Sequence, residues 1–474
     1  MLRRLSQPTA TRPAHAHSVG GGSRALTVLS VAFFMVILDT TIVNVALPSI
    51  QTGLRGTVTN LQWVVDGFTL ALASVLLAAG SMADRHGARR LFRIGLILFT
   101  AGSAYSAVAP TLGLLVAARI LQGLGAALIL PTSLALIAVM FPHPPDRARA
   151  LGIWAAAAGI ATALGPLVGG ALVALAGWRT IFMVNVPIGV GAWVLARRWL
   201  TEAPTRRTPL DWPGQVLGAS ALSLVTGALV EAGATAWTSD RVSGLGILGL
   251  VLGLLFLGWE RRVPYPLLPR RLFATPAFST ANVVGWVLNF GIYGQVFVLS
   301  LYFQQQRGFS ALATGFALVP FALITVVGPV VVGRLIARVG PQWPMVVGQG
   351  LAAGGTAALA FAGVTTPYLR LVPGLVALGV GMALTMPAMT AAAVQAAPMD
   401  LAGVASGFLN TARQIGGALG VAVLGSLVAH HFMEEWPVAL GMVTALFVLG
   451  GVAAARYGTA PTTPIAPPSE AQRS

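Results

Sequence analysis

The chain has 474 residues, of which 56% are hydrophobic and only 9% are charged, and its mean hydropathy is +0.81. This composition excludes an ordinary soluble domain and is typical of a protein with many membrane-spanning helices. The net charge of +16 comes from 29 basic residues, all of them arginine, and the lack of cysteine excludes disulfides and thiol chemistry.

Fourteen apolar segments are long enough to cross a bilayer, which takes about 20 residues. Their approximate limits are 25–50, 61–82, 91–109, 111–140, 150–175, 180–199, 214–234, 243–260, 276–304, 313–337, 344–364, 370–393, 402–428 and 437–456. With these spans 22 arginines fall on one side, 5 on the other and 2 within the membrane. Cytoplasmic loops of membrane proteins are enriched in arginine, so both termini are expected in the cytoplasm. The positive net charge therefore indicates the orientation of the chain in the membrane and not nucleic-acid binding.

Two glycine motifs of the first half recur in the second half. GSMADRHG at 80–87 recurs as GRLIARVG at 333–340, an offset of 253 residues (333 − 80). GLGAALILP at 123–131 recurs as GVGMALTMP at 379–387, an offset of 256 residues (379 − 123). The nearly constant offset predicts two duplicated six-helix bundles with the functional site where they meet.

The predicted fold class is therefore an all-α integral membrane protein with 14 transmembrane helices, arranged as two six-helix bundles and one inserted helix pair. The expected divisions are a cytoplasmic disordered tail at 1–24, an N-terminal bundle at 25–199, linkers and the inserted seventh and eighth helices at 200–275, a C-terminal bundle at 276–456 and a second cytoplasmic disordered tail at 457–474.

The first span contains an acid near its middle. Asp39 lies within LDTTIVNVALP, residues 38–48, and Asn44 follows on the same helix. A carboxylate at this depth costs roughly 2.5–3.5 kcal/mol on insertion scales, so it usually faces a partner or a cavity. Asp39 is either an acid satisfied inside the bundle or a group that gains and loses a proton during transport. The second interpretation is favoured because intramembrane acids are usually functional.

The fourth span carries Arg119 at a matching depth. At about 1.5 Å per residue, Asp39 lies about 13 Å and Arg119 about 12 Å from the outer ends of their spans. A buried guanidinium needs a carboxylate or backbone oxygens, so Asp39 is its predicted partner. Asp66 of the second span is shallower, at about 7–8 Å. It could be a second titrating group, a cation ligand or an interfacial acid.

The connection between the second and third spans, 80–91, combines glycine, an acid and arginines. Its glycines permit a tight turn and close helix approach. Asp84 could cap the following helix or pair with a neighbouring arginine. Such a polar cluster can break and re-form when two bundles move, whereas a plain positively charged loop would need arginine alone. The predicted switch residues are Gly80, Asp84, Arg85, Gly87, Arg89 and Arg90.

The fifth span contains GIATALGPLVGG at residues 159–170. Gly165 and Gly169 form a small face on which another helix can pack closely. Pro166 bends the helix and frees a backbone carbonyl. Packing alone would explain these residues, but they also suit a helix that seals the contact between the bundles. Gly159 and Gly170 complete the predicted motif.

The spans of the second half hold no acid well inside the membrane. Their candidate cavity residues are therefore neutral or basic, although each could equally form an interhelical hydrogen bond. No nucleotide-binding loop, metal-ligand cluster or nucleophile–base pair is evident, so an enzyme is not expected. The candidates for the substrate cavity in both halves are Asn44, Gln122, Asn289, Tyr293, Asn410, Arg413 and Gln414.

Together these motifs resemble the 14-helix drug:proton antiporters of the major facilitator superfamily. The similar segments are LDTTIVNVALP, GSMADRHGARRL, Arg119 with Gln122 and Gly123, GPLVGG, GWRTIFMVNVPIG at 177–189 and GVASGFLNTARQIGGALG at 403–420. They extend over about residues 25–456 and are specific for the family but not for the substrate. Unlike some relatives, this chain lacks an acid in the second-half spans, which argues against recognition of divalent cations.

The resemblance implies a proton-coupled exporter of hydrophobic drugs or antibiotics in the cell membrane, with Asp39 as proton carrier, Arg119 as its modulator and Asp66 assisting. It implies no cofactor besides the proton gradient, and the expected partners are lipid, protons and a small amphipathic substrate, without nucleic acid. We expect a monomer and a neutral or singly cationic substrate. The alternatives are a proton-coupled transporter of a metabolite such as an amino acid or sugar, and a non-transporting membrane receptor.

Overall fold

The computed structural model describes residues 19–457, except 203–204, 206–210, 265, 268 and 399–400. The tails expected at 1–18 and 458–474 lie outside the described residues. Residues 19–24, also expected in the tail, are instead helical, because helix α1 begins at Val19 and continues without a break to Leu54.

Each of the fourteen expected spans is occupied by a helix or by two consecutive helices. The helices are α1 (Val19–Leu54), α2 (Val58–His86), α3 (Ala88–Val108), α4 (Leu112–Met140), α5 (Pro144–Ala176), α6 (Thr180–Met183), α7 (Asn185–Trp199), α8 (Trp212–Ala232), α9 (Asp240–Glu260), η1 (Arg270–Ala274), α10 (Pro276–Leu301), η2 (Tyr302–Gln306), α11 (Ala311–Ala317), α12 (Val319–Val339), α13 (Gln342–Ala360), α14 (Tyr368–Ala396), α15 (Ala402–Leu427) and α16 (Phe432–Tyr457). Ten spans are long and apolar enough to cross a membrane within the described residues, and the bent α2 makes an eleventh. Helices α12, α13 and α15 are not among these candidates within the described residues, so their spans are assigned from their places in the second half.

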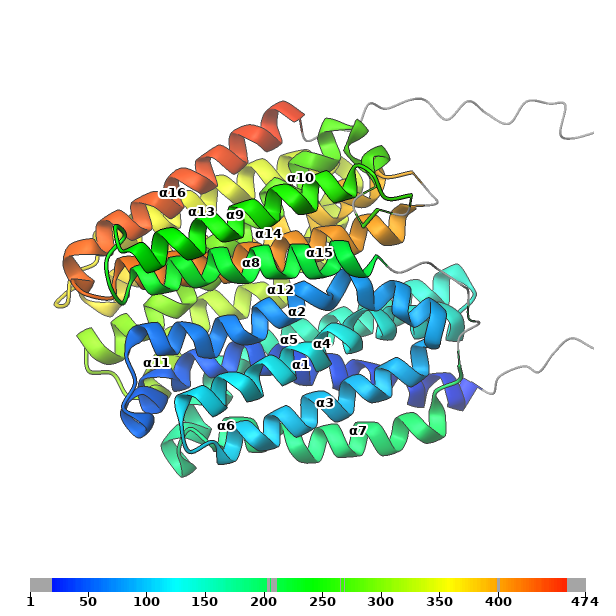
Figure 1. Ribbon diagram of the computed structural model, residues 1–474, viewed down its shortest axis with the longest axis horizontal. Coiled ribbons are helices and arrows are strands. Elements are labelled where there is room, and N and C mark those ends of the chain that lie inside the picture. The colour runs from blue at the N-terminus through cyan, green and yellow to red at the C-terminus, as the bar shows by residue number, and fades with distance from the viewer. Residues whose placement is uncertain are drawn as a thin grey trace, which may run out of the picture.

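Figure 1 shows the helices of the two halves, and the recurring glycine motifs make close helix contacts in both of them. In the first half, a Cβ at Gly123 of α4 would collide with the carbonyl oxygen of Phe68 of α2. In the second half, a Cβ at Gly379 of α14 would lie 2.8 Å from the carbonyl oxygen of Phe321 of α12. The recurring motifs therefore bring equivalent helices equally close, as the internal repeat predicts. The exact domain boundaries stay a prediction.

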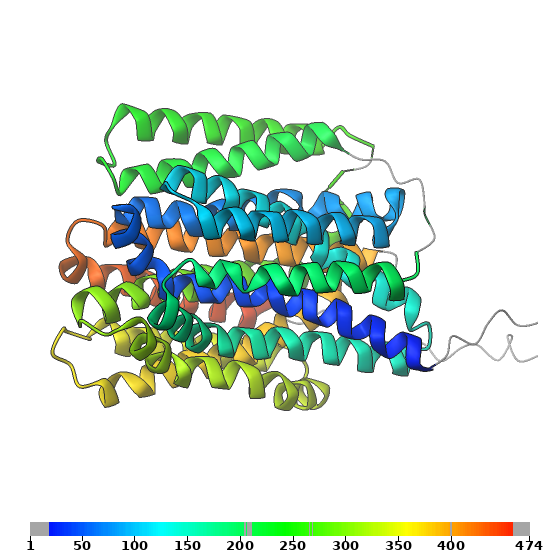
Figure 2. The same cartoon turned by 90° about the horizontal axis from the view of Figure 1, so that it is seen from below.

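The inserted pair, α8 and α9, lies at one edge of the molecule (Figure 2). Helix α8 contacts α2 and α15, and the Ser426 hydroxyl of α15 donates a hydrogen bond to the Leu229 carbonyl of α8. Helix α9 packs on α8 and leaves large apolar side chains uncovered, such as Leu250 and Leu254, which are 64% and 69% exposed. An apolar helix exposed in this way suits contact with lipid.

Candidate functional site

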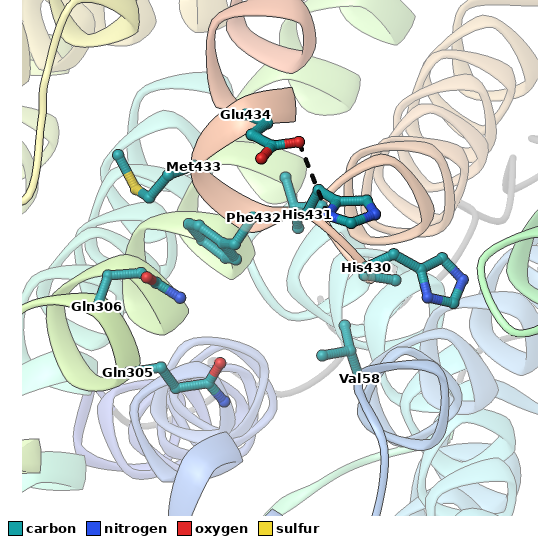
Figure 3. Close-up of a pocket in the computed structure, with 10 residues that line it drawn as sticks. Val58, Gln305, Gln306, His430, His431, Phe432, Met433 and Glu434 are labelled. Carbon is teal, nitrogen blue, oxygen red and sulfur yellow. Dashed lines mark ion pairs between the residues drawn. The ribbon is translucent and has the colours of Figure 1, made fainter.

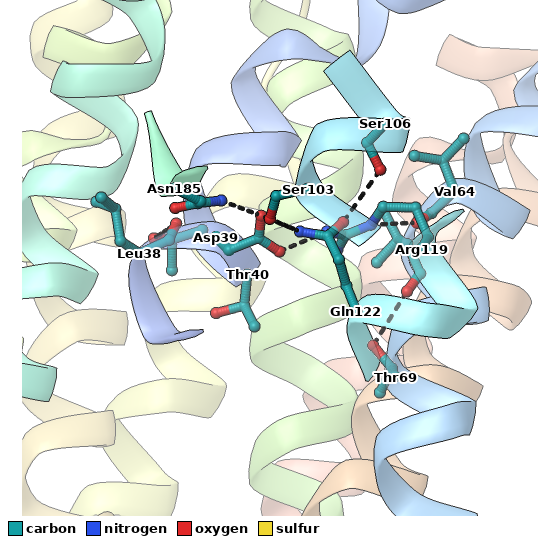
Figure 4. A network of polar contacts seen from close by, with 12 residues as sticks. Leu38, Asp39, Thr40, Val64, Thr69, Ser103, Ser106, Arg119, Gln122 and Asn185 are labelled. Carbon is teal, nitrogen blue, oxygen red and sulfur yellow. Dashed lines mark hydrogen bonds and ion pairs between the residues drawn. The ribbon is translucent and has the colours of Figure 1, made fainter. Parts of the chain in front are cut away.

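A buried polar cluster surrounds Asp39 of α1 (Figure 4). The Asp39 carboxylate is fully buried and forms an ion pair with the guanidinium of Arg119 of α4. Its other oxygen accepts hydrogen bonds from the side-chain amides of Gln122 of α4, at 3.1 Å, and Asn185 of α7, at 2.9 Å. Three helices therefore converge on one carboxylate.

Arg119 is also satisfied on its other sides. Its Nε donates to the Val64 carbonyl of α2 at 3.1 Å, and its Nη1 donates to Gln122 Oε1 at 2.9 Å. The guanidinium lies 4.5 Å from the centre of the Phe68 ring, which adds a cation–π contact. The structure thus joins Arg119 and Asp39, the pair that the matching depths predicted.

Asn185 was not among the sequence-predicted site residues. It is the first residue of α7 and lies within the sixth expected span, where its side chain meets Asp39. Ser103 and Ser106 of α3 were also missed, and both hold Gln122: Gln122 Nε2 donates to Ser103 Oγ at 2.7 Å, and Ser106 Oγ donates to Gln122 Oε1 at 3.2 Å. Asn185 lies within GWRTIFMVNVPIG, one of the segments that resemble the family, but no single residue of that segment was predicted for the site.

The chemistry of the Asp39 cluster depends on the direction of its hydrogen bonds. Arg119, Gln122 and Asn185 all donate to Asp39, and a carboxylate is an acceptor at both oxygens. A protonated Asp39 would place an O–H group among these donors. The cluster as observed therefore suits a charged carboxylate, and binding of a proton requires its partners to rearrange.

Asp66 of α2 lies outside the Asp39 cluster. It is fully buried, and neither of its carboxylate oxygens has a hydrogen-bond partner among the described residues. Gln62, one helical turn earlier, donates to the Val421 and Ala422 carbonyls of α15. Residues four positions apart share a helix face, so Asp66 is directed toward the contact between the two halves.

Glutamines join the two halves at the outer end, which is the end opposite the arginine-rich connections. Besides Gln62, Gln304 of η2 donates to the Val45 carbonyl of α1 at 3.0 Å, and Gln305 donates to Gln51 Oε1 at 2.6 Å. We call these contacts the outer seam.

Glycines bring the backbones together at the outer seam. A Cβ at Gly170 of α5 would lie 2.6 Å from the Ala311 carbonyl oxygen, and one at Gly315 of α11 would collide with the Pro166 carbonyl. The predicted small face also packs closely: Cβ atoms at Gly165 and Gly169 would strike α1. The glycines of the fifth span therefore serve both packing within one half and closure against the other half.

Below the outer seam, a small cavity lies between the halves near Arg119. Its volume is about 10 Å³, enough for about one water molecule. Its lining residues are Thr40, Val43, Val65, Phe68, Thr69, Arg119 and Tyr293. By contrast, Asn410 of α15 is exposed nearer the other end, and Val283 of α10 is 50% exposed. The halves are thus closed at the outer end.

Comparison with known proteins identifies the family. A family profile described as the Major Facilitator Superfamily matches residues 29–421. The chain belongs to the major facilitator superfamily. It is 37% identical over 435 residues to the methylenomycin A resistance protein of Streptomyces coelicolor, covering 91% of each chain. It is 36% identical over 438 residues to the tetracenomycin C resistance and export protein of Streptomyces glaucescens, covering 89% of this chain and 80% of that protein.

Solved structures of the superfamily share the fold. A crystal structure of the peptide transporter POT in complex with sulfate superimposes with a TM-score of 0.68, over 91% of this chain and 93% of that chain, at 16% identity. The human organic anion transporter MFSD10 gives 0.63 over 91% and 99%, also at 16% identity. The chain is accordingly a multi-pass membrane transporter and not an enzyme.

In this superfamily fold, the predicted cavity residues have different surroundings. Asn44 is buried and its side-chain amide donates to the Thr40 carbonyl of its own helix. Asn289 is buried, and its Nδ2 has no partner among the described residues. Tyr293 lines the small cavity beside Thr40. Gln414 is half-buried, and Gln122 belongs to the Asp39 cluster.

Asp84 and Gly80 do not make the contacts expected of them in this conformation. Helix α2 continues to His86, so Asp84 is exposed within it, forms no ion pair with the described arginines and does not cap α3. Glu202 takes that place, since its carboxylate accepts from the Arg89 backbone N–H at 2.8 Å. A Cβ at Gly80 would meet no atom within 4 Å, so no close approach requires glycine there.

The turn itself occurs at Gly87. Its φ of +93° is in the region that favours glycine, and a Cβ there would lie 2.8 Å from the Glu202 carboxylate. Arg89 also donates to the Arg197 carbonyl at 2.7 Å, whereas Arg85 and Arg90 are exposed. The loop is therefore held to the end of α7 and the linker behind it.

A second pocket, of about 350 Å³, opens at the outer end of the seam (Figure 3). It is lined by Val58 of α2, by Gln305 and Gln306 of η2, and by the 428–434 turn between α15 and α16. Because both halves contribute to its wall, its shape must change whenever the outer seam opens.

Replacing Gln304 with alanine is expected to weaken the outer seam. A neutral hydrogen bond contributes about 0.5–1.5 kcal/mol, so the open population should rise about two- to tenfold. The chain has no cysteine, so Val43→Cys, a buried residue at the small cavity, provides a single thiol reporter. A membrane-impermeant maleimide added outside should label it faster in Gln304→Ala.

The matched control is Gln306→Ala, in the same turn but without a bond to the other half among the described residues. Equal labelling rates in Gln304→Ala, Gln306→Ala and the parent protein would show that Gln304 does not hold the seam.

Proposed function

We propose that this chain exports hydrophobic drugs or antibiotics across the cytoplasmic membrane in exchange for protons that move inward. The observation that carries this proposal is the buried Asp39 cluster, in which Arg119 both pairs with Asp39 and lines the cavity between the halves. The relatives named for methylenomycin A resistance and tetracenomycin C export support a drug-like substrate.

The cycle follows from the hydrogen-bond directions. With the outer seam closed and Asp39 charged, the cluster is fully paired and the cavity faces the cytoplasm. When the outer seam opens, a proton from outside neutralises Asp39 and breaks the donor-only arrangement around it. Arg119 then loses its counter-charge and is free to move, which couples proton binding to the state of the cavity beside it. Return of the halves to the inward-facing state releases the proton to the cytoplasm.

Asp66 is proposed to assist, since it is a second buried acid facing the contact between the halves. The protein is proposed to work as a monomer in the lipid bilayer. Both termini are placed in the cytoplasm, because 14 spans return the chain to its starting side and the arginine-rich connections lie there.

Transport should be driven by the proton gradient and not by ATP, because the sequence has an intramembrane acid but no nucleotide-binding loop. Proteoliposomes containing the purified protein should move puromycin or tetracenomycin C only while a pH difference or a membrane potential is present. Transport that survives collapse of both gradients and depends on added ATP would contradict the proposal. Empty liposomes provide the control for passive leakage.

A further inference from the structure

Arg413 of α15 is a charged residue deep in the membrane without an acidic partner. It lies 11 residues after the start of α15, which places it about 17 Å along the helix, near the middle of a bilayer core about 30 Å thick. A charge at that depth is costly and usually faces a partner or a water-filled cavity. Among the described residues, no ion pair includes Arg413.

The surroundings of Arg413 leave part of its guanidinium available. Its Nη1 donates to Asn410 Oδ1 at 3.1 Å, but its Nε has no partner among the described residues. Its stem lies against α10, where a Cβ at Gly285 would be 3.3 Å from Arg413 Cγ. Neither α10 nor α15 contains an aspartate or glutamate, so neither helix can neutralise it.

Arg413 also lies beside groups that suit an amphipathic ligand. The Tyr293 ring lies against α15 one turn beyond Arg413, where a Cβ at Gly417 would be 3.4 Å from Tyr293 Cγ, and Tyr293 lines the small cavity between the halves. Trp286 of α10 is half-buried and stacks on Phe290 with ring centres 5.2 Å apart. We call Tyr293, Trp286 and Phe290 the aromatic wall of α10. The aromatic wall and Arg413 therefore combine aromatic surface with two hydrogen-bond donors, the Arg413 guanidinium and the Tyr293 hydroxyl.

The acids of the first half do not compensate this charge. Asp39 already forms an ion pair with Arg119 and accepts two amide hydrogen bonds. On α2, Gln62 meets α15 at Val421, and Asp66 lies one turn further along α2 without an ion pair among the described residues. Neither acid therefore forms an ion pair with Arg413 among the described residues.

We infer that Arg413, with Tyr293, binds the carboxylate of an amphipathic monoanionic substrate. A guanidinium presents a planar fork of donors that matches a carboxylate, and the aromatic wall takes the apolar body. This inference rests on the proposed export function and adds weak organic acids to the neutral and singly cationic compounds expected from the sequence.

The test uses matched acids and methyl esters on purified full-length protein: 2-naphthylacetic acid, 1-pyrenebutyric acid and nalidixic acid, each compared with its ester by equilibrium dialysis. The acids should bind more tightly than their esters. Arg413→Gln should weaken binding of the acids about tenfold to a hundredfold, the range for a lost hydrogen bond to a charged group, and change ester binding by less than about twofold.

Two further variants separate binding from folding and from net charge. Arg413→Lys keeps the charge without the fork and should retain part of the affinity for the acids. Arg370→Gln removes an exposed positive charge of α14 and should change neither class of ligand. The melting temperature shows whether Arg413→Gln is folded. If it is not, the affinities of Arg413→Lys and of the parent protein for the acids and esters are compared instead.

The inference is overturned if no acid binds more tightly than its ester, or if the Arg413 variants weaken acids and esters equally. Failure of the export proposal would look different. In that case no ester or acid would be transported by proteoliposomes under a proton gradient, even though binding of the acids to Arg413 could still be measured.

Discussion

Asp39→Asn is expected to reduce gradient-driven export to background while substrate binding persists. Asparagine has nearly the size of aspartate but cannot carry a proton on and off. Its amide also replaces one acceptor oxygen with a donor, among neighbours that all donate to Asp39. Binding should depend less on pH, because the main proposed proton carrier is gone. The measurement is substrate uptake into proteoliposomes under an imposed pH difference, with binding followed separately in detergent.

Asp240→Asn is the matched control, because Asp240 is an exposed acid in the first turn of α9, remote from the Asp39 cluster. It should export at the parental rate. Gradient-driven export by Asp39→Asn at a rate close to that of Asp240→Asn would exclude Asp39 as the proton carrier.

Arg119 should be coupled to Asp39 in the same assay. Removing one partner of a buried ion pair typically costs about 3–5 kcal/mol, so Arg119→Ala should lower stability and move the pH dependence of export. Arg119→Lys should rescue only in part, since the ammonium cannot reproduce the donors now directed at Asp39, Gln122 and Val64. Additive effects in a double-mutant cycle would show that the two residues act independently.

The sequence was sufficient for the Asp39–Arg119 pair because a helix converts residue number into depth, and both residues lie in uninterrupted helices, α1 and α4. Asn185 could not be found in this way. Its contact with Asp39 depends on which face of α7 meets α1, and an apolar run does not identify that face. The depth of a residue along a span can be read from the sequence, whereas the face that a helix turns toward its neighbours cannot.

The loop after α2 shows a different limit. Glycine and acid spacing predicted a turn, and Gly87 indeed makes it with positive φ. The spacing could not show that α2 continues through Asp84 or that Glu202, 113 residues beyond Arg89, supplies the carboxylate at the start of α3. Likewise, the small face of α5 was predictable, but its outer partner was not, because α11 belongs to the other half of the chain.

Gly170→Leu is expected to prevent closure of the outer seam and to reduce export to less than about a tenth of the parental rate. A Cβ at this position would lie 2.6 Å from the Ala311 carbonyl oxygen and 2.7 Å from Leu312 Cα. Both are backbone atoms, so a change of side-chain rotamer cannot relieve the clash. Overpacking a close contact typically costs about 1–3 kcal/mol, which shifts the two-state equilibrium about five- to a hundredfold toward the open form.

The same external maleimide assay on Val43→Cys should report this shift as faster labelling in Gly170→Leu. Gly191→Leu is the matched control, because Gly191 lies within α7 and a Cβ there has no atom within 4 Å. That variant should fold, label slowly and export normally. If Gly170→Leu instead labelled as slowly as Gly191→Leu and still exported drug, the close approach of α5 to α11 would not be the contact that closes the outer side. Fast labelling with lost export would mean that alternating access requires this backbone contact, which glycine permits because it has no side chain.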